Sequence, residues 1–239
     1  MSFLWNPWHG CQKISEGCRH CYVYRIDTKH GRDPSEVTRN KDFDLPIKKK
    51  KNGEYKIPSG ETVYTCFSSD FLLDVADRWR DEAWRYIRER QDLDFVFLTK
   101  RIHRLEECLP DDWGDGYDNV IIGCTCENQQ MADFRMPIFM SLPIKHRIVI
   151  SEPLLGYIDF CGLADNRIEK FVVGGESGDE ARVCDFEWVK GIHDFCVNNK
   201  ISFSFKQTGA RFRKDGKIYS IPRKYQFEQA KKSKLDVMF

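Results

Sequence analysis

The sequence predicts a single α/β domain (residues 1–239) built as a TIM-like (β/α) barrel, complete or partial, with parallel strands. Two observations support this prediction. Short runs rich in Val, Ile and Phe recur at intervals of roughly 25–30 residues, the length of one βα unit. Because these runs are apolar on both faces, they suit strands of a sheet that is covered on both sides. Segments with a helical spacing of apolar residues lie between them.

Seven strands are expected, each a short apolar run that ends in polar or Gly-rich residues. In order along the chain they are 3–5, 63–67, 95–98, 120–123, 148–150, 171–173 and 203–205. Helices are expected at 75–91, 101–108 and 186–198. The first is the clearest, because Val75, Trp79, Ala83, Tyr86 and Ile87 fall on one face of a helix.

Two basic segments interrupt the βα pattern. Residues 47–60 contain four consecutive lysines followed by Asn52-Gly53, a hairpin turn signal, and form either a basic β-arm or a solvated loop. Residues 207–239 form a C-terminal extension. From 206 to 239 there are ten Lys or Arg and three Asp or Glu, a local charge of +7. Asp215-Gly216 marks a second candidate hairpin turn.

Composition limits the class of protein. Hydrophobic residues make up 41% and charged residues 31%, and the net charge is +1, which is typical of a globular protein and excludes a generally basic nucleic-acid coat. No apolar run approaches the roughly 20 residues of a membrane helix, and no signal peptide is visible. We therefore expect a cytoplasmic protein without a membrane partner. Because disulfides are disfavoured in the cytosol, ten cysteines point to metal or redox chemistry.

Three cysteines form the sharpest motif. Cys11, Cys18 and Cys21 are spaced C-x6-C-x2-C just after the first expected strand, so three thiolates can converge on one metal centre. A structural zinc would need a fourth ligand, for which His9, His20 or a distant cysteine are candidates. A [4Fe–4S] cluster held by three cysteines would leave one iron open for a small ligand. Both alternatives remain open from the residues alone.

Polar residues follow six of the expected strands, where a barrel keeps its active site. They are Ser68-Ser69-Asp70, Thr99-Lys100-Arg101, Cys124-Thr125-Cys126-Glu127-Asn128, Ser151-Glu152, Gly174-Gly175-Glu176 and Lys206-Gln207. Together they predict a lined pocket. Cys124 and Cys126 are expected to point to opposite faces of their strand and so not to share a metal.

The chain resembles a phage-associated family of unknown function that has a three-cysteine motif and is related to the radical S-adenosylmethionine (SAM) enzymes. The resemblance extends over the whole chain in seven ordered blocks. These are W-N-P-x-x-G-C-x3-S-x-G-C-x2-C-Y (5–22), S-S-D-F (68–71), L-T-K-R (98–101), G-C-T-C-E-N (123–128), S-E-P-L-L-G (151–156), V-G-G-E-S-G (173–178) and F-K-Q-T-G (205–209).

The resemblance implies a specific chemistry. Cys11, Cys18 and Cys21 would bind three irons of a [4Fe–4S] cluster, and SAM would chelate the fourth. One electron from an electron donor would cleave SAM to a radical that abstracts hydrogen from the substrate. His20 would lie beside the adenine. A partner protein encoded nearby is also implied. Nucleic acid or a nucleotide is the candidate substrate, because the basic segments carry interleaved aromatic residues.

The chain departs from the usual radical SAM pattern in two ways. The first cysteine gap is six residues instead of three. Gly174-Gly175-Glu176 follows the sixth strand, whereas the Gly-Gly-Glu that grips SAM usually follows the second. Ser68, Ser69 and Asp70 are therefore candidates for binding the SAM amino group. Glu127 and Asn128 are candidates for binding its ribose, with Glu152 as a weaker one. Gly174 and Gly175 are also candidate cofactor-binding residues. Glu176, Glu152 and Lys206 are the candidate catalytic residues.

Two other functions compete with the radical SAM interpretation. One is a zinc-stabilised, non-catalytic barrel that binds a protein partner or nucleic acid. The other is a barrel hydrolase that uses Glu152 and Glu176 as a carboxylate pair, which leaves the three clustered cysteines unexplained.

Overall fold

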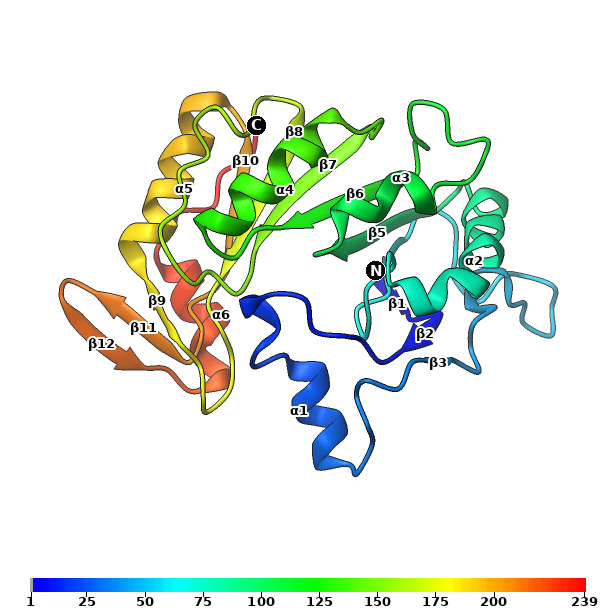
Figure 1. Ribbon diagram of the computed structural model, residues 1–239, viewed down its shortest axis with the longest axis horizontal. Helices are drawn as coiled ribbons and strands as arrows, with labels where there is room; N and C mark the ends of the chain where they lie inside the picture. The colour runs from blue at the N-terminus through cyan, green and yellow to red at the C-terminus, as the bar shows by residue number, and fades with distance from the viewer. Residues whose placement is uncertain (1) are drawn as a thin grey trace. The chain divides into compact units, whose positions relative to one another are not determined.

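The computed structural model describes residues 2–239 and has an α/β fold built on one seven-stranded sheet (Figure 1). The strands stand in the order β1 (Ser2–Trp5), β4 (Thr62–Thr65), β5 (Asp94–Thr99), β6 (Val120–Thr125), β7 (His146–Ser151), β8 (Ile168–Gly174) and β10 (Ser202–Gln207). The pairs β1/β4, β4/β5, β7/β8 and β8/β10 are parallel. All seven expected strands are present, and the α/β class is confirmed.

The strand order begins at β1 and ends at β10. Within residues 2–239 the sheet therefore does not form the complete eight-stranded barrel, and that form of the predicted fold is not confirmed. After β10 the chain instead forms a hairpin, β11 (Arg211–Lys214) and β12 (Lys217–Ser220), and then helix α6 (Arg223–Lys232). No helix in this range is both long and apolar enough to cross a bilayer.

The chain divides into two compact units. Unit 1 comprises the chain up to Lys13, Val23–Gly123 and Leu142–His146, and unit 2 comprises Ile14–Tyr22, Cys124–Ser141 and Arg147–Phe239. The single-domain organisation expected from the sequence stays a prediction.

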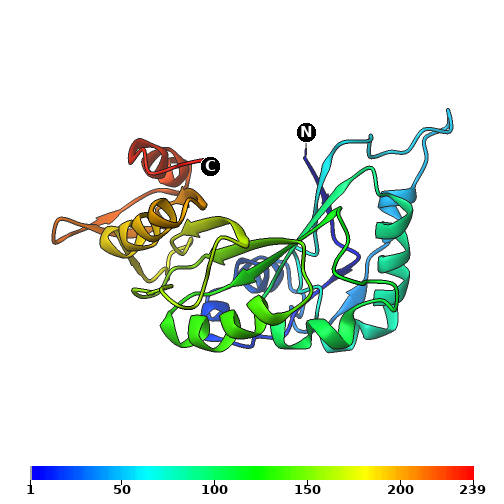
Figure 2. The same cartoon turned by 90° about the horizontal axis from the view of Figure 1, so that it is seen from above.

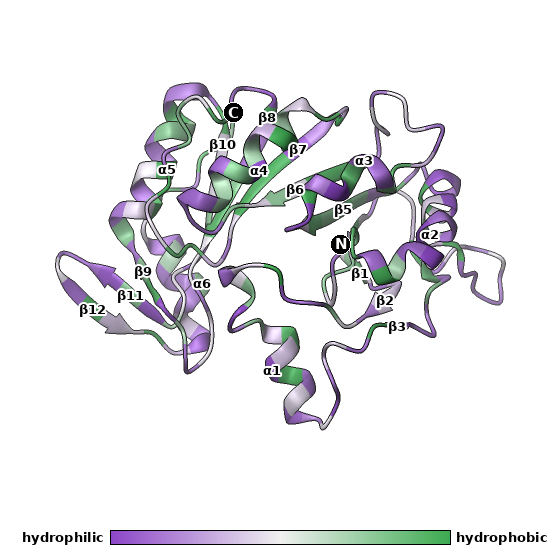
Figure 3. Ribbon diagram, viewed as in Figure 1, coloured by the Kyte–Doolittle hydropathy of each residue, from purple (hydrophilic) through white to green (hydrophobic). Residues whose placement is uncertain are grey.

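The core of unit 1 is aromatic. Helix α2 (Asp77–Glu89) buries Ala83, Tyr86 and Ile87 of the predicted face together with Trp84, whereas Val75 precedes the helix and is exposed. Phe71 lies between Trp84, at 5.0 Å between ring centroids, and Phe97 of strand β5, at 4.7 Å. Strand β5 is hydrophobic along most of its length in Figure 3. The expected helix at 101–108 is a 3₁₀ turn (Ile102–Arg104) that continues into α3 (Leu105–Cys108).

The basic segment at 47–60 is only partly hairpin-like. A 3₁₀ turn (Leu45–Ile47) precedes it, and one isolated antiparallel bridge joins Lys49 to Tyr55. Gly53 has a φ of +85° in the turn, which explains the glycine there. Strands β2 (Trp8–His9) and β3 (Thr38–Arg39) form a second short antiparallel pair, which joins the start of the cysteine motif to the segment before residues 47–60.

Unit 2 carries helices α4 (Gln129–Ser141), α5 (Phe186–Asn199) and α6 (Arg223–Lys232). The sequence predicted α5 but not α4, α6 or α1 (Tyr22–Lys29). Helix α4 contains Pro137 and has no clear apolar stripe, so its pattern gave no helical signal. Asp185 caps α5 by accepting a hydrogen bond from the backbone N–H of Glu187 at 3.0 Å.

A second sheet in unit 2 has the order β12 (Lys217–Ser220), β11 (Arg211–Lys214) and β9 (Val183–Asp185). Strands β11 and β12 form an antiparallel hairpin across Asp215 and Gly216, whose φ values are +49° and +72°. Both positive angles are those of a two-residue hairpin turn, as the Asp-Gly pair predicts. Figures 1 and 2 show the hairpin as an extended ribbon that stands out from the rest of unit 2.

Candidate functional site

The first half of the cysteine loop is fixed within unit 1 by the end of strand β4. The backbone N–H of Gly10 donates to the carbonyl of Ser68 at 3.3 Å, and the Ser69 hydroxyl donates to the Gly10 carbonyl. Gly10 has a φ of +91°, and a Cβ there would lie 2.2 Å from the carbonyl oxygen of Glu36. Only glycine can therefore occupy position 10 without a steric clash.

Asp70 and Arg101 also hold the first half of the cysteine loop. The Asp70 carboxylate is buried and accepts hydrogen bonds from the Thr99 hydroxyl at 2.8 Å and the Lys100 backbone at 3.0 Å. It also pairs with Arg101 at 3.3 Å. Arg101 in turn donates to the Gln12 carbonyl at 2.6 Å, and its Nη1 lies 3.9 Å from Cys11 Sγ. The contact places a guanidinium beside the first cysteine of the motif.

The second half of the loop is fixed within unit 2 by Glu127, which is fully buried. Its carboxylate accepts hydrogen bonds from the Ser15 hydroxyl, from the Gly17 backbone at 3.3 Å and from Arg135 at 2.6 Å. A Cβ on Gly17 would lie 2.9 Å from Glu127 Oε1. The next residue, Asn128, caps helix α4 by accepting from the Met131 backbone at 3.0 Å.

Glu176 holds the same half of the loop through Arg182. Arg182 donates to both oxygens of Glu176, at 2.6 and 2.9 Å, and lies 3.2 Å from Glu16 Oε1 in the loop. Burial opposes ionisation of Glu176, but the hydrogen bonds from Arg182 outweigh it and lower the pKa of this carboxyl. His20 Nδ1 lies 3.3 Å from a carboxylate oxygen of the exposed Glu180.

The ends of β7, β8 and β10 meet in a second polar cluster of unit 2. Glu152 accepts from Lys206 Nζ at 2.7 Å and from the Gln207 amide, which also bonds Arg223. A Cβ on Gly174 would lie 3.1 Å from the Glu152 carboxylate, so this glycine leaves room for the Glu152 side chain.

A Cβ on the neighbouring Gly175 would lie 2.2 Å from the carbonyl oxygen of Thr208. Gly174 and Gly175 therefore allow β8 and β10 to end in close contact.

Comparison with known proteins identifies the family. The chain matches, over residues 1–236, the family model described as "Protein of unknown function (DUF5131)". The chain belongs to this family. No curated protein and no solved structure matches the chain. The functional interpretation of this DUF5131 protein must therefore come from its own residues.

The motif cysteines differ in exposure from the other cysteines of this DUF5131 chain. All ten thiols are free; Cys11, Cys18 and Cys21 are half-buried, six others are buried and Cys161 is exposed. Within residues 2–239, no group of three or more His, Cys, Asp or Glu side chains is gathered as in a metal site. His9, a candidate fourth zinc ligand, has its Nε2 2.7 Å from Asp27 Oδ2.

Cys124 and Cys126 correct one expectation from the sequence. Residues two apart on a strand share a face, so their side chains do not point to opposite faces. Both are buried, and a hydrogen bond with Cys124 and burial together raise the pKa of the Cys126 thiol. Buried neutral thiols of this kind are weak nucleophiles.

Three arginines that hold the predicted site residues were missed from the sequence. They are Arg135, which pairs with Glu127, Arg182, which pairs with Glu176, and Arg223, which binds Gln207. Arg135 lies on a helix without a helical pattern, and the other two lie in polar segments. No local signal distinguishes them from solvated arginines, because their partners, 8, 6 and 16 residues earlier in the chain, lie outside the helix, strand or loop position that a regular spacing would pair with them.

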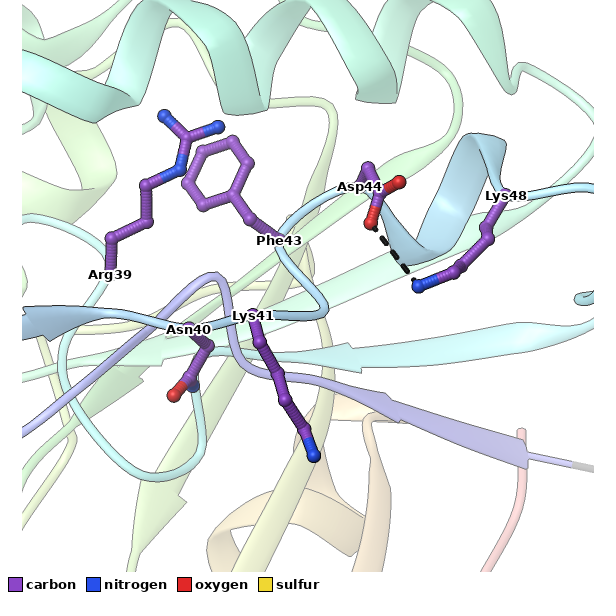
Figure 4. Close-up of a pocket in the computed structure, with 6 residues that line it drawn as sticks. All are labelled: Arg39, Asn40, Lys41, Phe43, Asp44 and Lys48. Atoms are coloured by element: carbon purple, nitrogen blue, oxygen red, sulfur yellow. Dashed lines mark ion pairs between the residues drawn. The ribbon is translucent and has the colours of Figure 1, made fainter.

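A shallow pocket in unit 1 of the DUF5131 chain contains none of the predicted site residues. It has a volume of about 570 Å³ and is lined by Arg39, Asn40, Lys41, Phe43, Asp44 and Lys48 (Figure 4). The Arg39 guanidinium lies 3.8 Å from the centroid of the Phe43 ring and pairs with Glu82 at 2.6 Å. Lys48 pairs with Asp42 at 3.1 Å and with Asp44 at 3.8 Å. The charges of Arg39 and Lys48 are therefore both neutralised by carboxylates of the chain.

Proposed function

We propose that this protein is a radical SAM-type enzyme whose [4Fe–4S] cluster is bound by Cys11, Cys18 and Cys21. One observation supports the proposal most strongly. Among ten cysteines, only these three are half-buried, and they lie in one eleven-residue stretch of the chain. The other seven are either packed in the core or fully exposed, as cysteines without a metal commonly are.

The residues of the loop fit a thiolate-bound cluster. Arg101 is positioned beside Cys11, so a guanidinium lies next to the first cysteine of the motif. Ser15 and Gly17 are tied to Glu127, which fixes the backbone that carries Cys18. When bound, such a cluster supplies the electron that cleaves SAM and so initiates hydrogen abstraction from a substrate.

The strand-end residues divide into two groups under this proposal. The carboxylates of Asp70, Glu127 and Glu176 are each engaged by arginine and hold the loop, so we assign them to positioning. Glu152 and Lys206 form a more open pair, because Lys206 is exposed. We assign this pair to binding a charged group of SAM or of the substrate.

The test is anaerobic purification and cluster reconstitution, followed by a visible spectrum and iron and sulfide analysis. We expect a brown protein with about four iron and four sulfide per chain. Cys18→Ala should lose both, whereas Cys161→Ala, which removes the exposed cysteine outside the motif, should retain both. The reconstituted protein is then assayed for reductive cleavage of SAM.

Two results would contradict the proposal. A colourless protein with one tightly bound zinc after reconstitution would favour the zinc-stabilised binding module instead. Equal iron loss in Cys18→Ala and Cys161→Ala would show that the iron is not bound by the motif.

A further inference from the structure

An aromatic cavity lies in the C-terminal part of unit 2, beside the β11–β12 hairpin and helix α6. It has a volume of about 410 Å³, within the range of small-ligand pockets. Phe186, Phe205 and Phe212 contribute to its lining. The ring centroids of Phe205 and Phe212 are 5.9 Å apart, and those of Phe186 and Phe212 are 6.2 Å apart. The cavity is therefore lined by flat aromatic surfaces.

Two further aromatic side chains of this lining are open to solvent. Tyr219 is 47% exposed and Tyr225 is 42% exposed. All four residues of β12, the edge strand that carries Tyr219, are exposed. Tyr219 lies on this edge strand and Tyr225 on helix α6. Exposed tyrosines contribute little to a core, and they are typical of a binding surface.

Positive charge surrounds the cavity. Lys214 Nζ lies 4.7 Å from the Phe186 ring centroid, and Lys224 Nζ lies 4.7 Å from the Tyr225 ring centroid. Ten Lys or Arg face only three Asp or Glu across residues 206–239, although the whole chain has a net charge of +1. Two of the nearby acidic groups are paired: Asp185 with Arg213 at 3.2 Å, and Glu228 with Lys232 at 2.8 Å.

We propose that this surface binds single-stranded nucleic acid, with a base entering the aromatic cavity and the phosphates contacting the lysines of the hairpin and α6. The charge excess attracts a polyanion, and the aromatic rings select one that carries flat bases. In a duplex the bases are stacked and paired, so inserting one into the cavity costs additional unpairing and unstacking energy. The inference goes beyond the proposed function, since none of these residues is a motif cysteine.

The test measures fluorescence anisotropy of labelled dT20, rU20 and a 20-base-pair duplex with the full-length chain over a range of salt concentrations. We expect both single strands to bind more tightly than the duplex, with affinity that falls as salt rises. Tyr219→Ala/Tyr225→Ala should weaken dT20 binding about tenfold or more, whereas Tyr219→Phe/Tyr225→Phe should not. Lys214→Ala/Lys224→Ala should weaken binding and flatten the salt dependence.

Matched controls lie elsewhere in unit 2. Tyr157→Ala removes another exposed tyrosine, and Lys190→Ala another exposed lysine; both should leave binding unchanged. The proposal is overturned if dT20 does not bind, if inorganic polyphosphate competes as well as an oligonucleotide of equal charge, or if Tyr157→Ala weakens binding as much as the Tyr219/Tyr225 change. Repeating the assay with Cys18→Ala separates this surface from the cluster: unchanged binding supports the site whatever the metal result, and lost binding overturns it.

Discussion

At the scale of single residues, glycines and buried carboxylates hold the cysteine loop. Gly10 combines a positive φ with a Cβ position 2.2 Å from a backbone oxygen. We expect Gly10→Ala to lower the free energy of unfolding by at least about 3 kcal/mol, because both the backbone and its neighbour must move. Gly53→Ala is the matched control: its φ is also positive, but nothing lies within 4 Å, so the cost should be about 1 kcal/mol. Urea unfolding measures both, and equal costs would contradict the steric explanation.

Glu127 is the residue on which the second half of the loop depends. In Glu127→Gln the guanidinium of Arg135, which is almost fully buried, loses its anionic partner. We expect the free energy of unfolding to fall by about 3 kcal/mol, since breaking a buried ion pair leaves an uncompensated charge. Asp194→Asn, which removes an exposed partner of Lys190, should cost less than about 1 kcal/mol. Thermal or urea unfolding of the two variants distinguishes a buried structural pair from a replaceable one.

At the scale of elements, Arg90 ties the end of α2 to the segment at 45–60. Its buried guanidinium donates to the Pro46 and Ile57 carbonyls and to Asp92. The hydrogen bonds from Arg90 lower the pKa of Asp92 to about 2, against an ordinary value of 3.8. Because the folded state binds the proton less tightly than the unfolded state, the pair stabilises the protein above about pH 4, and this contribution is lost as the pH falls towards 2.

Asp92→Asn tests this link. The variant should be less stable than the wild type at pH 7, and the difference should shrink between about pH 4 and pH 2, where Asp92 becomes protonated in the wild type. Urea unfolding at pH 7, 4 and 2.5 measures the difference. Asp115→Asn, at an exposed site, should show no such trend. A constant difference across this range would show that the Arg90 pair is not its source.

The elements also show what the sequence could and could not predict. The strands were found because a buried parallel strand is apolar on both faces, and the pattern needs no knowledge of its neighbours. Helix α4 is not predicted from the sequence, because it contains Pro137 and its apolar residues do not recur with the spacing of one helical face. The candidate site residues were placed at strand ends, which the fold confirms. The arginine partners missed from the sequence lie 6 to 16 residues away, but no helical or strand spacing relates them to their acceptors, and only the fold brings each pair together.

At the scale of the whole molecule, the near-neutral net charge is the sum of two oppositely charged parts of the chain. The chain has a net charge of +1, while residues 206–239 carry +7, so the remaining residues carry −6. Copies of the protein can therefore attract one another through oppositely charged regions at low salt. We expect static light scattering to show self-association near pH 7.5 in low salt and its loss at about 0.3 M salt, where the Debye length falls below about 6 Å.

Lys231→Glu/Lys232→Glu tests the electrostatic origin of this association. The two changes lower the net charge by four, to −3, and reduce the positive charge of the C-terminal region. Scattering at low salt should fall to the high-salt value of the wild type. Association that persists in this variant, or that is insensitive to salt, would point to apolar contacts instead.

The anchoring of the cysteine loop also sets an order in time. Ser15 and Gly17 are bonded to Glu127, and Glu16 to Arg182, which are 112, 110 and 166 residues later in the chain. A ribosome releases the N-terminal residues first, so the loop emerges long before the side chains that hold it exist. The anchors of the first half, at Ser68, Ser69 and Arg101, are made much earlier than those of the second half. The loop is therefore complete only after Arg182 has left the ribosome, late in synthesis.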